Sequence, residues 1–147
     1  MPRSRYLESR FPKLRSTHYS VTSNRAVRYN CVAWVFGDRR RDWDLLRYWP
    51  SKTELGDTIA SMVAFFRSFG FETCLLDKSL EPGVDKIALY RKNGTVEFSH
   101  VACQQPDGTW SSKLGKGRDI SHDTLECLEG DVLDEYGTVA VIMKWAI

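Results

Sequence analysis

The chain has 147 residues, of which 42% are hydrophobic and 27% are charged, and its formal net charge is +2 at pH 7. This length allows one hydrophobic core and is too short for two large domains. The near-neutral charge gives no indication of a polyanionic partner, so neither nucleic acid nor a membrane surface is expected as a partner. The longest apolar runs, residues 32–36 and 139–143, are far shorter than the roughly 20 residues of a membrane span.

The first part of the chain is basic and lacks the apolar run of a secretory signal. We therefore expect a cytoplasmic protein, with delivery as an effector as the other route. Residues 1–28 are predicted to be an irregular basic lead-in, and residues 29–147 to be a single domain. The four cysteines are spread without close pairs, which predicts reduced thiols and no zinc site. No metal and no cofactor are expected.

Two helices are predicted in the first half of the domain. Residues 30–37, NCVAWVFG, fit a short buried helix that Asn30 caps, with Cys31 in its first turn. A longer helix is predicted to begin at Ser51, where capping-box spacing is followed by apolar residues at helical intervals as far as Gly70.

The second half of the chain is predicted to be mainly strands. Residues 71–76 fit a short strand. Asn-Gly and Pro-Asp-Gly turn sequences then separate three predicted antiparallel strands, residues 86–91, 95–104 and 109–114. Ser121 is expected to cap a brief helix, and residues 137–145 fit a central strand. Helices followed by a meander indicate the α+β class.

Cys31 is the candidate nucleophile because of its predicted place in a helix. The helix dipole and the free amides of a first turn lower the pKa of a thiol. The backbone amides of Asn30 and Cys31 could also bind the oxyanion of an attacked carbonyl. The apolar residues that follow fit a buried, inert thiol equally well, so the local sequence leaves both interpretations open.

The candidate base is a histidine in a predicted strand. A base must be held within reach of the thiol, and of the three histidines only His100 lies in a predicted strand. His18 falls in the lead-in and His122 falls just behind a predicted helix cap. Both are therefore predicted to be surface residues.

Two residues are candidates for orienting the base. If the hairpin turn is centred on Asp107, Ser112 lies on the same face as His100 and diagonally beside it. Asp119 follows a few residues later, and a carboxylate is the better partner for an imidazolium. Taken alone, each residue also fits a simple strand or loop position.

The following segments occur in one order along the chain: EPGVDKIALY (residues 81–90), a strand beginning HVA at His100, a Pro-Asp-Gly turn and Ser112. Together with Asn30-Cys31 upstream, this order resembles NlpC-type papain-like cysteine peptidases. In that family His, Asn, Gln or an acid usually stands at the position of Ser112. The N-C-x-A-W and W-x-S-K-L-G segments, residues 30–34 and 110–115, also resemble a compact, little-characterised bacterial family of the same superfamily.

The resemblance implies a minimal papain-like fold, in which a nucleophile helix packs on an antiparallel β-meander. It implies a cysteine hydrolase that acts on an amide or isopeptide bond. The implied catalytic residues are Cys31, His100 and Ser112, with Asp119 as the alternative third residue.

The expected partner is a peptide or protein substrate, which Trp34 and Trp110 are candidates to contact. A core position is the commoner fate of such tryptophans. One alternative function is a non-catalytic peptide-binding module on the same scaffold. Another is a glutamine deamidase or acyltransferase effector that uses the same cysteine and histidine. The substrate, the bond cleaved and the oligomeric state are left open.

Overall fold

The computed structural model describes residues 3–22, 58–114, 119–132 and 134–146. The first of these ranges holds helix α1 (Arg5–Arg10), the 3-10 helix η1 (Pro12–Ser16) and strand β1 (Tyr19–Val21). The second range holds helix α3 (Ile59–Ser68) and strands β2 (Glu72–Thr73), β3 (Val84–Arg91), β4 (Phe98–Gln104) and β5 (Trp110–Lys113). The last two ranges hold strand β6 (Asp119–His122), the 3-10 helix η2 (Glu126–Leu128) and strand β7 (Thr138–Ala146).

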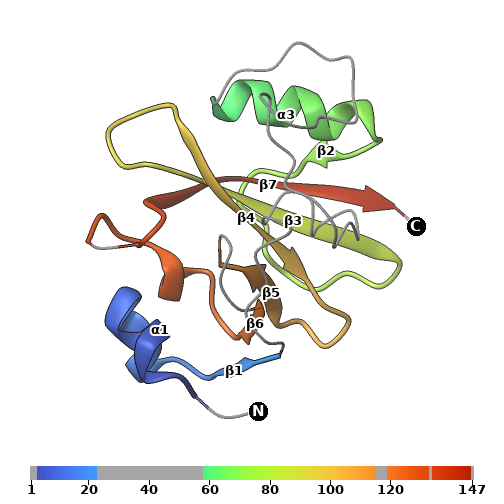
Figure 1. Cartoon of the computed structure of the whole chain (residues 1–147). Helices are drawn as coiled ribbons and strands as arrows, with labels where there is room; N and C mark the ends of the chain where they lie inside the picture. Colours follow the sequence, from blue (N-terminus) through green and yellow to red (C-terminus); the bar gives the residue numbers. More distant parts are fainter. Residues whose placement is uncertain (1–2, 23–57, 115–118, 133, 147) are drawn as a thin grey trace.

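The strands form one seven-stranded antiparallel sheet in the order β1-β6-β5-β4-β3-β7-β2. Figure 1 shows α3 (green) on one side of this sheet and α1 (blue) beside β1 and β6 on the other. Among the helices of the described ranges, only α3 exceeds six residues in length. The predicted minimal papain-like α+β fold is therefore wrong, and the protein is a small β-rich domain. Pairing of β1, β6 and β2 extends the predicted meander into a larger sheet.

Helix α3 covers one face of the sheet. Thr58 caps it by accepting a hydrogen bond from the backbone N–H of Ser61 at 3.1 Å, and Gly70 follows its end with φ of 103°. The helix therefore begins later than the predicted start at Ser51, which lies outside the described residues. No helix in the part of the chain that the structure describes is long and apolar enough to span a membrane.

A hydrophobic cluster lies beneath α3. Its buried residues come from α3, from the segment after it and from the central strands, namely Met62, Phe65, Phe66, Phe71, Ile87, Leu89, Val101 and Met143. Alternation along β3 sends Ile87 and Leu89 to this face and Ala88 and Tyr90 to the other. The central strand is thus buried on both faces.

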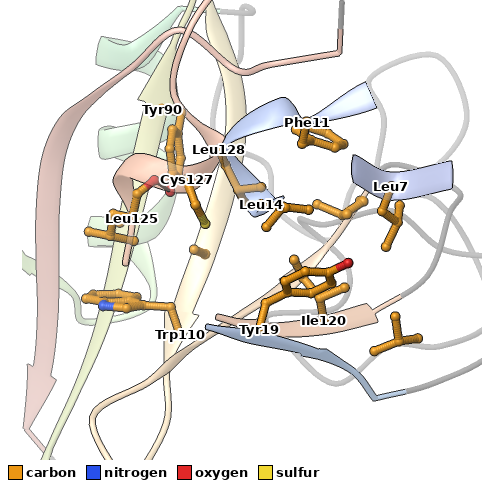
Figure 2. Close-up of a cluster of buried hydrophobic side chains, with 14 of the residues drawn as sticks. Leu7, Phe11, Leu14, Tyr19, Tyr90, Trp110, Ile120, Leu125, Cys127 and Leu128 are labelled. Carbon is orange, nitrogen blue, oxygen red and sulfur yellow. Dashed lines mark hydrogen bonds between the residues drawn. The ribbon is translucent and has the colours of Figure 1, made fainter. Parts of the chain in front are cut away.

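The opposite face of the sheet is covered by the N-terminal elements and by η2. Leu7, Phe11 and Leu14 pack in one buried cluster with residues of β6 and η2, as Figure 2 shows for Ile120 and Leu128. Strand β1 also pairs with β6. The predicted irregular lead-in is therefore wrong for the described residues before residue 23, which belong to the core of the domain.

The three strands predicted between the turn sequences are confirmed. Strands β3, β4 and β5 pair in sequence order, and Gly94 and Gly108 occupy their turns with φ of 74° and 90°. Strand β7 lies between β3 and β2, as predicted for a central strand.

Two local predictions in this half of the chain are wrong. The predicted strand over residues 71–76 shortens to β2, and Leu75 has a positive φ of 59°, which no strand residue adopts. Ser121 lies in β6 rather than at a helix cap, and only the short 3-10 helix η2 follows.

Candidate functional site

A line of buried polar side chains crosses the sheet face that the N-terminal elements cover. His100 of β4, Ser112 of β5 and His122 of β6 are each 0% exposed. Ladder pairing sets Ser112 opposite Ile120 and Trp110 opposite His122, so side chains two residues apart share this face. Three neighbouring strands therefore each contribute one polar group to an otherwise apolar cluster.

Hydrogen bonds join these side chains into a chain, which we call the His100–Ser112–His122 relay. The His100 Nε2 and Ser112 Oγ atoms are 3.0 Å apart, and the Ser112 Oγ and His122 Nε2 atoms are 2.8 Å apart. The Nδ1 atom of His122 lies 2.7 Å from the backbone carbonyl oxygen of Thr124. The structure thus brings Ser112 beside His100 on the diagonal that the hairpin register predicts.

The direction of each hydrogen bond follows from the carbonyl at the end of the relay. A carbonyl oxygen can only accept, so Nδ1 of His122 carries a proton and donates it to Thr124. In the neutral ring, Nε2 of His122 then accepts from the hydroxyl of Ser112. The Ser112 oxygen is left to accept from Nε2–H of His100. His100 is therefore the tautomer whose Nδ1 keeps a lone pair.

Both histidines are neutral at physiological pH. Burial, with a smaller contribution from nearby His122, holds the pKa of His100 well below its usual value. Burial also lowers the pKa of His122 to about 4, although the Thr124 carbonyl and Asp123 oppose the shift. His100 is consequently in the form that can accept a proton.

The Nδ1 atom of His100 is the remaining acceptor of the site. It is buried and has no hydrogen-bond partner among the residues that the structure describes. Buried polar atoms without a partner are uncommon because they carry a desolvation cost. A general base needs such an atom, with its lone pair held in one direction and out of water.

Aromatic packing and a β-bulge hold the imidazole ring. The Tyr136 ring stacks on His100 with centroids 4.1 Å apart and planes 7° from parallel. Strand β4 bulges where it pairs with β3. Tyr90 pairs with His100 and Arg91 pairs with Phe98, so Ser99 is the extra residue without a partner on β3. The hydroxyl of this extra residue donates to the Tyr136 carbonyl at 2.5 Å. The bulge thereby ties the stacking ring to the strand that carries the base.

The other predicted site residues have different places. Asn30, Cys31 and Trp34 lie outside the described residues. Asp119 is buried in β6 opposite Lys113, whereas Ser112 is the residue hydrogen-bonded to Nε2 of His100.

Trp110, the other predicted substrate contact, is a core residue in this structure. It is 2% exposed and belongs to the cluster drawn in Figure 2, in which it is packed near Leu125. Trp110 therefore has the core position that is common for tryptophan.

Sequence reasoning missed the part of His122 in the site. The side chain was predicted to lie on the surface and is fully buried, whereas the side chain of His18 is 88% exposed, as predicted. The segment Asp119–His122 alternates Ile120 and His122 toward one face, which is a strand pattern. Its four residues are too few to distinguish that pattern from a helix start.

A second cysteine and histidine pair lies at the end of the relay but is not a reactive one. The Cys127 Sγ atom is 3.6 Å from Nδ1 of His122 and donates to the Thr124 carbonyl at 3.1 Å. Burial raises the pKa of the Cys127 thiol to about 12. Because thiolates are the reactive form, this cysteine is an inert core residue, and Figure 2 shows it between Tyr90 and Leu128.

A family model described as a domain of unknown function (DUF7689) matches residues 20–144. The chain belongs to this family. The matched residues of the DUF7689 domain run from β1 to β7 and include the whole His100–Ser112–His122 relay. No curated protein and no solved structure matches the chain. The family description names no activity, so the chemistry of the relay is the basis for a function of this DUF7689 domain.

Proposed function

We propose that this DUF7689 domain is a cysteine hydrolase of an amide or isopeptide bond. In this proposal Cys31 is the nucleophile, His100 is its general base, and Ser112 holds the imidazole. The resemblance to NlpC-type peptidases stays a prediction, and the proposal makes no use of their fold. The role of Cys31 is proposed from its sequence neighbours, and the roles of His100 and Ser112 are proposed from the geometry of the relay.

The observation that carries the proposal is the state of His100. Its Nε2–H is engaged by Ser112, its ring is clamped by Tyr136, and its buried Nδ1 keeps a lone pair without a partner in the described ranges. A histidine that served packing alone would gain by satisfying both ring nitrogens. An oriented, neutral imidazole with one unused acceptor has the properties of a general base.

The hydrolysis proceeds in two steps, acylation of Cys31 and hydrolysis of the thioester. Nδ1 of His100 takes the thiol proton of Cys31, and the thiolate attacks the carbonyl carbon to form a tetrahedral intermediate. The amides of Asn30 and Cys31 stabilise the oxyanion, and the C–N bond breaks as His100 returns the proton to the leaving amine. Water, deprotonated by His100, then attacks the thioester, and the thiol and a carboxylic acid are released.

The described cysteines do not compete for the role of nucleophile. Burial raises the thiol pKa of Cys103 to about 11 and of Cys127 to about 12, and it also raises the thiol pKa of Cys74. None of these thiols forms much thiolate at neutral pH. Cys31 is therefore the cysteine on which a selective electrophile tests the proposal.

The test is labelling of the folded protein with iodoacetamide at pH 7, followed by peptide mapping. We expect rapid labelling of Cys31, loss of that labelling in Cys31→Ala, and unchanged labelling in the matched control Cys74→Ala. Replacing the base in His100→Gln should slow alkylation by about 100-fold. Rapid labelling that persists in Cys31→Ala would assign the reactive thiol elsewhere and overturn the proposal.

A product assay separates hydrolysis from the reactions that would use the same two residues. Glutamine deamidation releases ammonia, acyl transfer consumes an added amine, and hydrolysis of a peptide amide produces a new amino terminus. We expect new amino termini from a mixed peptide library and none from the Cys31→Ala variant. A reactive Cys31 with binding but no product would instead support the peptide-binding module.

A further inference from the structure

His122 does more than fill space at the end of the relay. Both of its ring nitrogens are engaged, Nε2 with Ser112 at 2.8 Å and Nδ1 with the Thr124 carbonyl at 2.7 Å. It lies on β6, one strand beyond Ser112 and two strands beyond His100. Its hydrogen-bonded connection to His100 therefore runs through the hydroxyl of Ser112.

The relay has a single favoured polarity, and His122 sets it. The carbonyl of Thr124 can only accept, so it fixes the proton of His122 on Nδ1 and leaves Nε2 as an acceptor. That acceptor draws the hydroxyl proton of Ser112 away from His100. Reversing the relay would set the lone pair of Nδ1 against the lone pairs of a carbonyl, in a buried site where an unmade hydrogen bond is costly.

We infer that His122 is a positioning residue, which through Ser112 keeps the proton of His100 on Nε2 and the Nδ1 lone pair available. This inference rests on the proposed function for its catalytic meaning, because there Nδ1 of His100 accepts the proton of Cys31. The hydrogen-bond polarity itself is independent of that function. His122 extends the site to a third strand, β6, and ends it on the Thr124 backbone carbonyl, which side-chain changes cannot remove.

Two substitutions at position 122 separate positioning from packing. Phe in His122→Phe retains a buried ring but offers no acceptor, so the hydroxyl of Ser112 turns its proton toward Nε2 of His100. The proton of His100 must then move to Nδ1, and the base loses its lone pair. Gln in His122→Gln carries an amide oxygen that can accept from Ser112 and preserve the polarity.

The tautomer can be read directly by NMR of the full chain with nitrogen-15 in its histidine rings. In the wild type and in His122→Gln we expect His100 to show a protonated Nε2 and an unprotonated Nδ1. In His122→Phe the protonated nitrogen should be Nδ1, and iodoacetamide labelling of Cys31 should slow by about 10- to 100-fold. His122→Gln should label within about threefold of the wild type on the same principle.

Controls separate this effect from a damaged core. Ile120→Val removes one methylene group from the same face of β6 and should change neither the tautomer nor the labelling rate. Ser112→Ala cuts the relay without altering the volume at position 122, so the double variant S112A/H122F should show the same tautomer ratio as S112A. If His122→Phe does not fold, Ser112→Ala alone decides the question, because it cuts the relay between the two histidines: an unchanged His100 tautomer in Ser112→Ala overturns the positioning role.

The outcomes distinguish the inference from the proposed function. An unchanged His100 tautomer in His122→Phe overturns the positioning role. So does a difference in the His100 tautomer ratio between S112A and the double variant S112A/H122F, because His122 would then act without Ser112. A changed tautomer with wild-type labelling of Cys31 also overturns it, because the lone pair then has no part in thiol activation. Absence of Cys31 labelling in the wild type overturns the proposed function, while the tautomer measurement still tests the relay.

Discussion

The two faces of the sheet bury side chains of different chemistry. The hydrophobic cluster beneath α3 joins the helix to the central strands, and the buried polar residues on that side, Ser111, Lys113 and Asp119, lie at the β5–β6 end of the sheet. The face under α1, η1 and η2 instead encloses the His100–Ser112–His122 relay within an apolar cluster. The apolar face stabilises the fold by removing surface from water, and volume and shape are what it requires. The polar face stabilises less, because two imidazoles are desolvated there, and it requires exact hydrogen-bond partners.

The difference shows where this domain places stability and where it places chemistry. Among the residues that the structure describes, every ring nitrogen and hydroxyl of the relay has a hydrogen-bond partner except Nδ1 of His100. A fully satisfied polar network would be expected if the histidines only specified the fold. An unused lone pair on a ring that Tyr136 clamps and Ser112 engages at its other nitrogen supports a functional assignment for the relay.

The largest expected effect is a loss of stability on the apolar face. Phe66 is fully buried between α3 and the sheet, so Phe66→Ala should lower the free energy of unfolding by about 4 kcal/mol, measured in urea. Phe69→Ala removes the same side chain from a position that is 40% exposed and should cost much less. Neither should alter the tautomer of His100. A tautomer change in Phe66→Ala with the fold retained would break the division between the two faces.

The next effect is a loss of stability in acid that comes from the polar face. The pKa of His122 falls from 6.5 in the unfolded chain to about 4 in the fold, so the unfolded state binds more protons between these values. Stability is complete above pH 6.5 and falls toward pH 4, by about 3 kcal/mol for His122 alone. His100, with its pKa also lowered, adds to the loss in the same direction.

Urea titrations at pH 7, 6, 5 and 4 measure how steeply the free energy of unfolding falls with pH. His122→Gln should reduce this pH dependence, and His18→Gln should not, because the side chain of His18 is 88% exposed. Equal slopes for the wild type and His122→Gln would show that His122 is not buried as a neutral ring.

The smallest of the three effects tests the centre of the relay. Ser112→Ala leaves Nε2–H of His100 and Nε2 of His122 without their partner, which should cost about 2 kcal/mol of stability. Ser111→Ala is the matched control, since Ser111 is buried next in the chain and faces the opposite side of the sheet. It should cost less than about 1 kcal/mol. Equal losses in the two variants would mean that the relay hydrogen bonds contribute nothing specific.

Local sequence was enough to predict the middle of the sheet and one contact in the site. Asn93-Gly94 and Pro106-Asp107-Gly108 are turns whose glycines need positive φ, and they set the ends and register of β3, β4 and β5. Because successive side chains of a strand point to opposite faces, the register alone predicted that Ser112 lies diagonally beside His100. The Nε2 atom of His100 and the Oγ atom of Ser112 are 3.0 Å apart.

Short strands at the sheet's margins escaped prediction because their partners are distant in the chain. Strand β1 has three residues and pairs with β6 near the other end of the sequence, so no local turn signals it. Within β6, Ser121 carries a residue type that also caps helices, and local pattern favoured that alternative. Pairing with β5 decides the conformation, and this error hid the place of His122.

Sequence by itself determined the hairpins, the strand of His100 and its neighbour Ser112, since turn chemistry and two-residue alternation act over short distances. Tertiary structure alone decided that the N-terminal residues join the core, that the fold is a β-rich sheet, and that His122 closes the relay on the Thr124 carbonyl. These features depend on which strands meet. The free energy of that choice comes from burial and ladder pairing between segments far apart in the chain.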